Sequence, residues 1–279
     1  MIDLHTHSTA SDGTCTPAEL IREAREAGLR AIALTDHDTL DGLDEAAASA
    51  SEAGIIFIPG IELEIKHHPG EFHLLGLGLE DWHNSSLALF LDEIREHRNN
   101  RNEQMVELIR QDGIDISHRD LEKAAGGRII ARPHFARVLV EKKVAKNIKH
   151  AFDRFLGVGQ KFYLPKEVIE LEKGIQLIHE AGGKAVIAHP LSLYLSWGKM
   201  PERFREWKEL GLDGIEARHS GANKNQMARF EALAEELGLI ISGGSDYHGK
   251  NRRDRALGKG GGFQHIPDEL LSPFLPDRK

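Results

Sequence analysis

Disulfide bonds are excluded within this chain, because Cys15 is the only cysteine among its 279 residues. Disulfides are common in secreted proteins and rare in reducing compartments, so the sequence favours a cytoplasmic protein. Cys15 also lacks the neighbouring residues that mark catalytic cysteines. We therefore assign it a structural or incidental role.

Long apolar runs and an excess of positive charge are also missing. No stretch approaches the roughly 20 apolar residues of a membrane-spanning helix, and the N-terminus lacks the pattern of a signal peptide. We therefore expect no membrane partner. The net charge of −8 argues against a surface that coats nucleic acid. A nucleotide or a short oligonucleotide is still compatible as a substrate, because bound metal and a few arginines can form a local positive pocket.

Strands and helices alternate in the two end regions of the chain. Residues 1–84 and 157–279 show apolar runs followed by helical patterns, whereas residues 85–156 show helices with little strand. Alternating βα units with a helical insert favour a (β/α) barrel over an open sheet. We therefore predict a barrel from the two end regions, with residues 85–156 inserted as a helical lid. This insert is also the most basic part of the chain.

Local signals predict several element boundaries. Thr16 and Glu19 have the spacing of a capping box at the start of a helix. A pair of strands is expected at residues 62–66 and 71–79. Another helix is expected at residues 166–181, where apolar residues recur with helical spacing.

Histidines and aspartates gather in three short segments, each beside an apolar run. Imidazole and carboxylate are both ligands of divalent metals. Residues two apart on a strand point to the same face, so His5 and His7 can reach one ion. Charged groups at the carboxyl ends of barrel strands lie at the usual active-site face. The sequence therefore predicts a multinuclear metal site and a metal-dependent hydrolase, with phosphate esters as preferred substrates. The segments are Ile2-Asp3-Leu4-His5-Thr6-His7 with Asp12, Thr35-Asp36-His37-Asp38, and Gly244-Ser245-Asp246-Tyr247-His248.

Most of these side chains have a simpler explanation when each is taken singly. His5 and His7 fit ordinary core or surface histidines, and Asp12 fits a turn. Asp38 suits the N-cap of a helix. His37 has no such alternative role, which strengthens the metal hypothesis for its segment.

Three further residues extend the predicted site. Asp36 is expected to orient a metal-bound imidazole by accepting its second N–H. Glu62 follows an apolar strand, where a buried carboxylate is costly unless it is paired or bound to metal. His73 lies inside an apolar run, and a hydrogen-bonded core histidine is the simpler explanation of this residue alone.

The insert adds basic residues that suit phosphate. The segment Arg132-Pro133-His134-Phe135-Ala136-Arg137 begins a helix. Arg137 lies about one turn after His134, so both side chains can face one pocket. One arginine guanidinium can donate two parallel hydrogen bonds to two oxygens of a phosphate. The alternative for the arginines of the insert is a solvated helical face.

Taken together, these motifs resemble the PHP (polymerase and histidinol phosphatase) family of metal-dependent phosphoesterases. The resemblance covers nearly the whole chain and is strongest to the stand-alone nucleotide phosphoesterases, which carry an inserted helical lid. It implies an α/β fold, a distorted (β/α)7 barrel of the PHP type. The matching segments are Asp3-Leu4-His5-Thr6-His7-Ser8, Ser11-Asp12-Gly13, Thr35-Asp36-His37-Asp38, Gly60-Ile61-Glu62, His73, Pro133-His134-Phe135-Ala136-Arg137, Ala188-His189-Pro190 and Gly244-Ser245-Asp246-Tyr247-His248.

The resemblance also implies ligands for two or three divalent ions, with Mn, Fe or Zn as the candidates. It implies phosphate contacts and a catalytic role for Arg137 and His189. Arg132 and His219 are further candidates for substrate binding. The implied ligands are His5, His7, Glu62 and Asp246 for one ion, Glu62, His73 and His134 for a second, and Asp12, His37 and His248 for a third.

The implied activity is hydrolysis of the 3′-phosphate of nucleoside 3′,5′-bisphosphates, such as pAp to AMP, with a metal-activated water as the nucleophile. One alternative is a 5′-3′ exonuclease on short RNA or DNA oligonucleotides. Another is a histidinol-phosphate phosphatase, and a third is a non-catalytic PHP binding module. The complete set of implied ligands argues against the binding module. The sequence indicates no particular oligomeric state.

Overall fold

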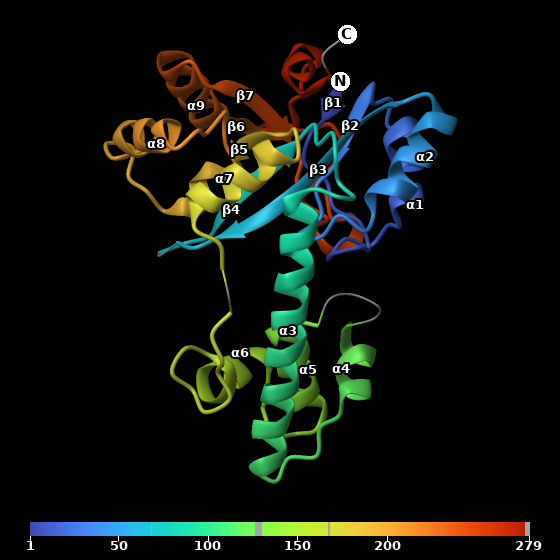
Figure 1. The fold of residues 1–279 in the computed structure, drawn as a ribbon, viewed down its shortest axis with the longest axis vertical. Coiled ribbons are helices and arrows are strands. Elements are labelled where there is room, and N and C mark those ends of the chain that lie inside the picture. Colours follow the sequence, from blue (N-terminus) through green and yellow to red (C-terminus); the bar gives the residue numbers. More distant parts are fainter. Residues whose placement is uncertain (68, 126–129, 167, 277–279) are drawn as a thin grey trace. The chain divides into compact units, whose positions relative to one another are not determined.

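The chain forms two compact units (Figure 1). The computed structural model describes residues 1–67, 69–125, 130–166 and 168–276. Unit 1 comprises Met1–Leu89 and Val168–Lys279, and unit 2 comprises Phe90–Glu167. The insert predicted at residues 85–156 overlaps unit 2, and its function as a lid stays a prediction.

Unit 1 is built on a seven-stranded sheet in which the strands follow chain order. All neighbouring strands are parallel except β4, which is antiparallel to both β3 and β5. The last strand returns to the first: the Leu4 N–H donates to the Gly243 carbonyl at 3.1 Å. The sheet is therefore a nearly closed, distorted (β/α)7 barrel, which confirms the predicted fold. The strands are β1 (Ile2–Asp3), β2 (Ala31–Leu34), β3 (Ile56–Ile65), β4 (Phe72–Leu77), β5 (Lys184–Ile187), β6 (Gly214–His219) and β7 (Ile240–Gly244).

Helices cover the strands of unit 1, with α1 and α2 on one flank of the sheet and α7, α8 and α9 on the other (Figure 1). The predicted capping box is confirmed: Glu19 N–H donates to Thr16 Oγ1 at 3.2 Å, and Thr16 N–H donates to the Glu19 carboxylate at 2.9 Å. These helices are α1 (Pro17–Glu26), α2 (Leu43–Ala53), α7 (Leu171–Glu180), α8 (Met200–Glu209) and α9 (Lys224–Leu237), and short 3-10 helices are η2 (Pro190–Leu193), η3 (Gly249–Asn251), η4 (Gly261–Phe263) and η5 (Asp268–Phe274).

Two predicted boundaries are wrong. The helix expected from residue 166 begins only at Leu171, because Ile169 is extended and forms a parallel bridge with Ile65. The strand expected from residue 62 begins at Ile56 and runs through Pro59 and Gly60 as one strand. Glycine is needed at position 60, because a Cβ there would lie 2.8 Å from the Gly76 carbonyl of β4.

The core of the barrel consists of apolar side chains from successive strands. Leu4 beyond β1, Ala33 of β2, Leu75 of β4 and Val186 of β5 have no solvent exposure, and they share one cluster with Phe274 of η5. Burial of this aliphatic surface holds the strand ends in place. The polar residues that follow these strands are therefore attached to rigidly packed strand ends.

Unit 2 is helical and has its own core. Met105, Ile109, Leu121, Phe135 and Leu139 are fully buried there in one cluster. Residues 148–156 form a short α-helix followed by a π-helical turn. No helix in the described part of the chain is long and apolar enough to cross a membrane. The helices are α3 (Ser86–Gln111), which begins in unit 1, α4 (His118–Ala125), α5 (Arg132–Glu141), α6 (Ile148–Ala151) and η1 (Phe152–Leu156).

Candidate metal centre

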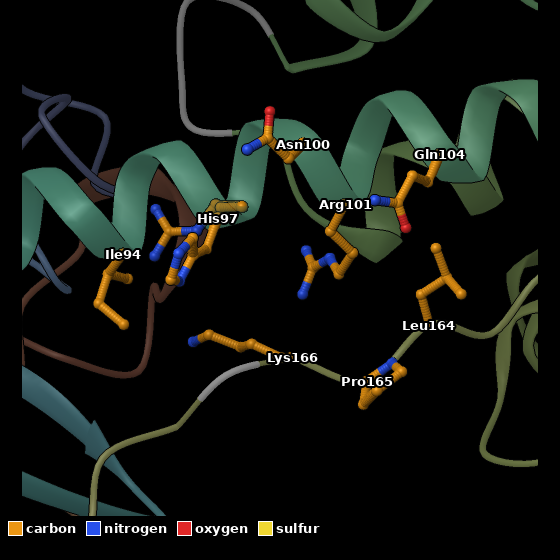
Figure 2. Close-up of a pocket in the computed structure, with 9 residues that line it drawn as sticks. Ile94, His97, Asn100, Arg101, Gln104, Leu164, Pro165 and Lys166 are labelled. Atoms are coloured by element: carbon orange, nitrogen blue, oxygen red, sulfur yellow. The ribbon is translucent and has the colours of Figure 1, made fainter.

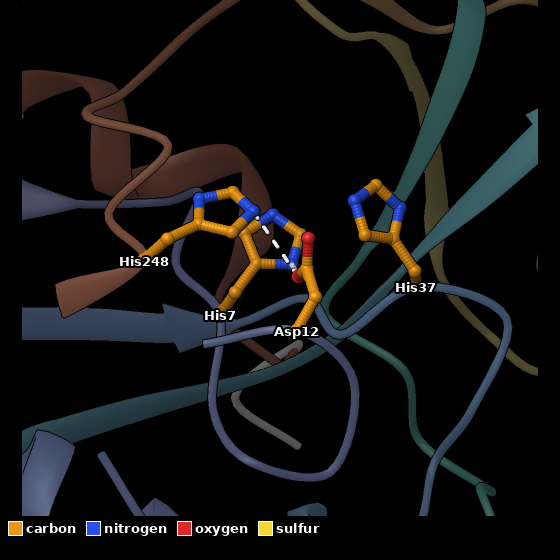
Figure 3. Close-up of side chains that lie close together, drawn as sticks. All are labelled: His7, Asp12, His37 and His248. Atoms are coloured by element: carbon orange, nitrogen blue, oxygen red, sulfur yellow. Dashed lines mark ion pairs between the residues drawn. The ribbon is translucent and has the colours of Figure 1, made fainter. Parts of the chain in front are cut away.

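The strand ends of unit 1 bring histidines and carboxylates together. Within each of three groups, ligand atoms lie within 4.8 Å of one another. His5, His7, His37, Asp246 and His248 follow the carboxyl ends of parallel strands, whereas Glu62 lies within β3. The reversed strand β4 contributes His73 from its beginning, opposite Glu64 of β3. The groups are His7, Asp12, His37 and His248 (Figure 3); His5, His7 and Asp246; and His37, Glu62 and His73.

Glu62 is the centre of this arrangement, and its side chain is 1% exposed. Its Oε1 lies 2.9 Å from His73 Nδ1 and 2.9 Å from His189 Nε2. Its Oε2 lies 3.1 Å from His37 Nδ1, and 3.3 Å and 3.2 Å from the Nε2 atoms of His5 and His7. Five imidazoles therefore surround one buried carboxylate.

These donors fit bound metal better than they fit hydrogen bonding. Glu62 Oε2 and His7 Nδ1 are buried without a hydrogen-bond partner among the described residues. His5 Nε2 and His7 Nε2 face each other at 3.1 Å. Buried polar atoms left in this state are costly, by about 1–3 kcal/mol each. Imidazole nitrogens and carboxylate oxygens that converge in this way suit divalent transition metals.

The group drawn in Figure 3 adds a more accessible side to the centre. His248 Nε2 lies 3.1 Å from Asp12 Oδ1, and the Asp12 side chain is 52% exposed. The ring of His7 stacks on the ring of His248 at 4.1 Å and on that of His37 at 4.6 Å between centroids. The group therefore combines two buried histidines, His7 and His248, with the half-buried His37 and a carboxylate that solvent reaches.

The ionisable side chains of the centre shift one another's pKa values. Burial lowers the pKa of His7, but the nearby carboxylates of Asp246 and Glu62 outweigh it and raise the pKa to about 10. Burial is the largest cause at His37, and the charges of His7 and His73 act in the same direction, so the pKa of His37 falls to about 4. Burial raises the pKa of Glu62, but the charges of His37 and His5 outweigh it and hold the pKa well below its usual value. The carboxylate is thus ionised, as a metal ligand must be.

Two expectations for the second predicted segment are wrong. Among the described residues, no imidazole contacts Asp36; its carboxylate accepts hydrogen bonds from Ser8 N at 2.8 Å, from Ser8 Oγ at 2.6 Å and from Ser11 Oγ, and so fixes the loop that carries Asp12. Asp38 is not a helix N-cap, because α2 begins only at Leu43.

The predicted residues of unit 2 have contacts of their own. His134 Nδ1 accepts a hydrogen bond from Ala131 N at 3.0 Å, and Arg137 Nη1 donates to the Ala124 carbonyl at 2.6 Å. The guanidinium of Arg132 lies 5.3 Å from the ring centroid of Tyr163. The metal role of His134 and the substrate roles of Arg132 and Arg137 stay predictions.

Unit 2 also contains a cation-lined pocket of about 420 Å³ between α3 and the segment at residues 164–166 (Figure 2). Arg98, Arg101 and Lys166 line it together with polar and apolar neighbours. Both arginines are half-buried, so the alternative of a fully solvated face does not describe them. The lining residues are Ile94, His97, Arg98, Asn100, Arg101, Gln104, Leu164, Pro165 and Lys166.

Sequence reasoning missed Glu216, a fully buried carboxylate on β6. Its Oε1 accepts a hydrogen bond from His5 Nδ1 at 2.9 Å, and its Oε2 accepts one from the His189 backbone N–H at 2.6 Å. This contact assigns the Nδ1 proton of His5 and leaves Nε2 available to a metal. The signal was present in the sequence, because a carboxylate inside the apolar strand is as costly to bury as Glu62.

We expect Glu216→Gln to weaken metal binding by about 10- to 100-fold, because the neutral amide makes the His5 imidazole a poorer ligand. Competition with a chelating dye measures this affinity. Glu231→Gln is the matched control, since Glu231 is half-buried on α9 and pairs with Arg218. Unchanged affinity in the Glu216 variant would show that the contact is only structural.

A nearly closed barrel with imidazoles and carboxylates gathered at its strand ends defines the class of metal-dependent hydrolases. Residues 3–164 match the PHP domain. The chain therefore belongs to the PHP family and is a metal-dependent phosphoesterase, which confirms the resemblance drawn from its motifs.

Known relatives extend over most of the chain. A 5′-3′ exoribonuclease of Haemophilus influenzae is 35% identical over 246 residues, 88% of this chain and 89% of the relative. A 3′,5′-nucleoside bisphosphate phosphatase of Chromobacterium violaceum is 35% identical over 258 residues, 92% of this chain and 90% of the relative. A solved structure of a predicted metal-dependent phosphoesterase from Bifidobacterium adolescentis is 31% identical, with a TM-score of 0.77 over 98% of this chain and 94% of that one.

Proposed function

We propose that this protein removes the 3′-phosphate from nucleoside 3′,5′-bisphosphates, as in the conversion of pAp to AMP. The observation that carries the chemistry is the convergence of five imidazoles on the buried Glu62 carboxylate. Support for the substrate comes from the Chromobacterium violaceum relative that is named for this activity.

The proposed ligand sets hold two or three ions of Mn, Fe or Zn. When bound, such ions polarise phosphoryl oxygens and lower the pKa of water. Asp246 reaches toward both His5 and His7, at 3.7 and 3.5 Å between Oδ1 and each Nε2. The ligands proposed are His5, His7, Glu62 and Asp246; Glu62, His73 and His134; and Asp12, His37 and His248.

His189 is the proposed catalytic residue of unit 1 that is not a ligand. Its Nε2 lies 2.9 Å from Glu62, its Nδ1 lies 2.8 Å from Ser192 Oγ, and its backbone N–H donates to Glu216. Its φ of 25° is strained for a residue with a Cβ. These contacts hold the ring beside the centre, where it can contact the reacting phosphate or transfer a proton.

A specific observation favours the 5′-3′ exonuclease as a second candidate function. The cation-lined pocket of unit 2 offers Arg98, Arg101 and Lys166 to an anionic ligand. An oligonucleotide carries phosphates beyond the one that reacts, and basic grooves bind such backbones. A relative of 35% identity is named as an exoribonuclease, which supports the same substrate class.

The experiment that tests the function compares four substrates under one manganese concentration: pAp, a short 5′-phosphorylated RNA, AMP and histidinol phosphate. We expect the largest kcat/KM for pAp, measured by phosphate release, with slower cleavage of RNA. A preference for histidinol phosphate would contradict the proposal, and no turnover of any substrate would indicate a binding module.

A further inference from the structure

A cavity of about 250 Å³ lies beside the metal centre. We call it the arginine cavity, because Arg252 and Arg255, from the segment that follows β7, line it. His189 and His219 also line it, and so does Asp246, one of the proposed ligands. The cavity therefore adjoins the centre but presents a different set of charged groups.

Arg255 is oriented by its Nη1 and by its Nε, which lies 3.4 Å from Asp254 Oδ2. Its side chain is 9% exposed, and Nη1 contacts Ser220 Oγ, His219 Nε2 at 2.9 Å and Asp246 Oδ2 at 3.4 Å. No residue in the described ranges accepts a hydrogen bond from Nη2. A guanidinium fixed on one side is pre-organised to bind an anion on the other.

The two oxygens of Asp246 face two neighbouring spaces. Oδ1 lies 3.7 Å from His5 Nε2 and 3.5 Å from His7 Nε2, on the side of the metal centre. Oδ2 lies 3.5 Å from His219 Nε2 and 3.4 Å from Arg255 Nη1, on the side of the arginine cavity. When one phosphate is bound at the metal centre, the arginine cavity is therefore available to a second anionic group of the same substrate.

We propose that the arginine cavity binds the phosphate that is not cleaved, through Nη2 of Arg255 and the guanidinium of Arg252. This inference rests on the proposed function, because it requires a substrate with two phosphates. Arg252 is 44% exposed and pairs with Asp254 at 3.4 Å, so it stands at the solvent side of the cavity. Glu71 also lines the cavity and opposes the two arginines in charge.

The test compares pAp with p-nitrophenyl phosphate, which has a single phosphate, in the manganese-loaded enzyme. Arg252→Ala should raise the KM for pAp by about tenfold, as expected for loss of a charge-assisted contact. The effect on p-nitrophenyl phosphate should be several times smaller. Arg253→Ala is the matched control, because Arg253 is exposed on the same loop and does not line the cavity.

Two further variants separate binding from structure. Arg255→Lys keeps the charge but loses the fixed fork, and should raise the KM for pAp with metal content unchanged. Glu71→Gln should lower that KM, because it removes negative charge from the cavity. Equal losses on both substrates, or no loss in either arginine variant, would overturn the proposal.

If the proposed function is wrong, the same experiment gives a different result from the one that overturns the arginine cavity. Wild-type enzyme would then hydrolyse p-nitrophenyl phosphate but not pAp. In that case the inhibition constant of pAp against p-nitrophenyl phosphate replaces the KM as the readout. A tenfold weaker inhibition of the Arg252→Ala enzyme would still support the cavity, and identical inhibition of the two enzymes would overturn it.

Discussion

Replacement of Glu62 by glutamine should lower kcat by roughly a thousandfold, which corresponds to about 4 kcal/mol in the activation barrier. The carboxylate lies between His73 and His189 on one oxygen and three further imidazoles on the other. The amide of glutamine is neutral, and its NH2 group cannot bind a cation. Metal content should therefore fall together with activity.

The substitution is nearly isosteric, so the fold of the barrel should survive, as measured by circular dichroism. Glu52→Gln is the control, because Glu52 is an exposed carboxylate on α2. Near-normal turnover and metal content in the Glu62 variant would remove Glu62 from the centre.

Removal of metal should abolish turnover, by at least about a thousandfold, and addition of manganese should restore it. His5 and His7 bind protons strongly when metal is absent: the carboxylates around them outweigh burial, and the pKa of His7 rises to about 10. Metal must displace these protons, so its affinity should rise with pH over the neutral range.

Calorimetry in buffers of different ionisation enthalpy measures this exchange. The metal-free protein should release protons when manganese is added near neutral pH. Protein that stays fully active in excess chelator, or that binds manganese without proton release, would contradict the assignment of these histidines as ligands.

The barrel and much of its polar end could be predicted because their signals are local. Thr16 and Glu19 show the capping box in the sequence itself, and apolar runs followed by His5, His7 and His37 mark strand ends. Glu216 was missed because its partner His5 is 211 positions away. No spacing rule connects a residue just after the first strand with one on the sixth strand, so only the closed barrel brings them into contact.

Contacts between segments far apart in the sequence also explain the predictions that were wrong. Asp36 was expected beside an imidazole, but the backbone of Ser8 and the hydroxyls of Ser8 and Ser11 take its oxygens. The sequence around Ile169 has the spacing of a helix, but Ile169 is extended because it forms a parallel bridge with Ile65. In each case a contact from a distant segment outweighs the local preference.

The reversed strand β4 couples the metal centre to the way the sheet is assembled. Glu62 lies opposite Leu75, and Glu64 lies opposite His73, so Glu62 and His73 are diagonal neighbours on the inner face. A slip of one residue between β3 and β4 would turn His73 outward and place Leu74 at the ligand position. Only the correctly registered hairpin can offer both side chains to one ion. Metal uptake would thus favour correctly paired chains during folding, as a check on strand alignment.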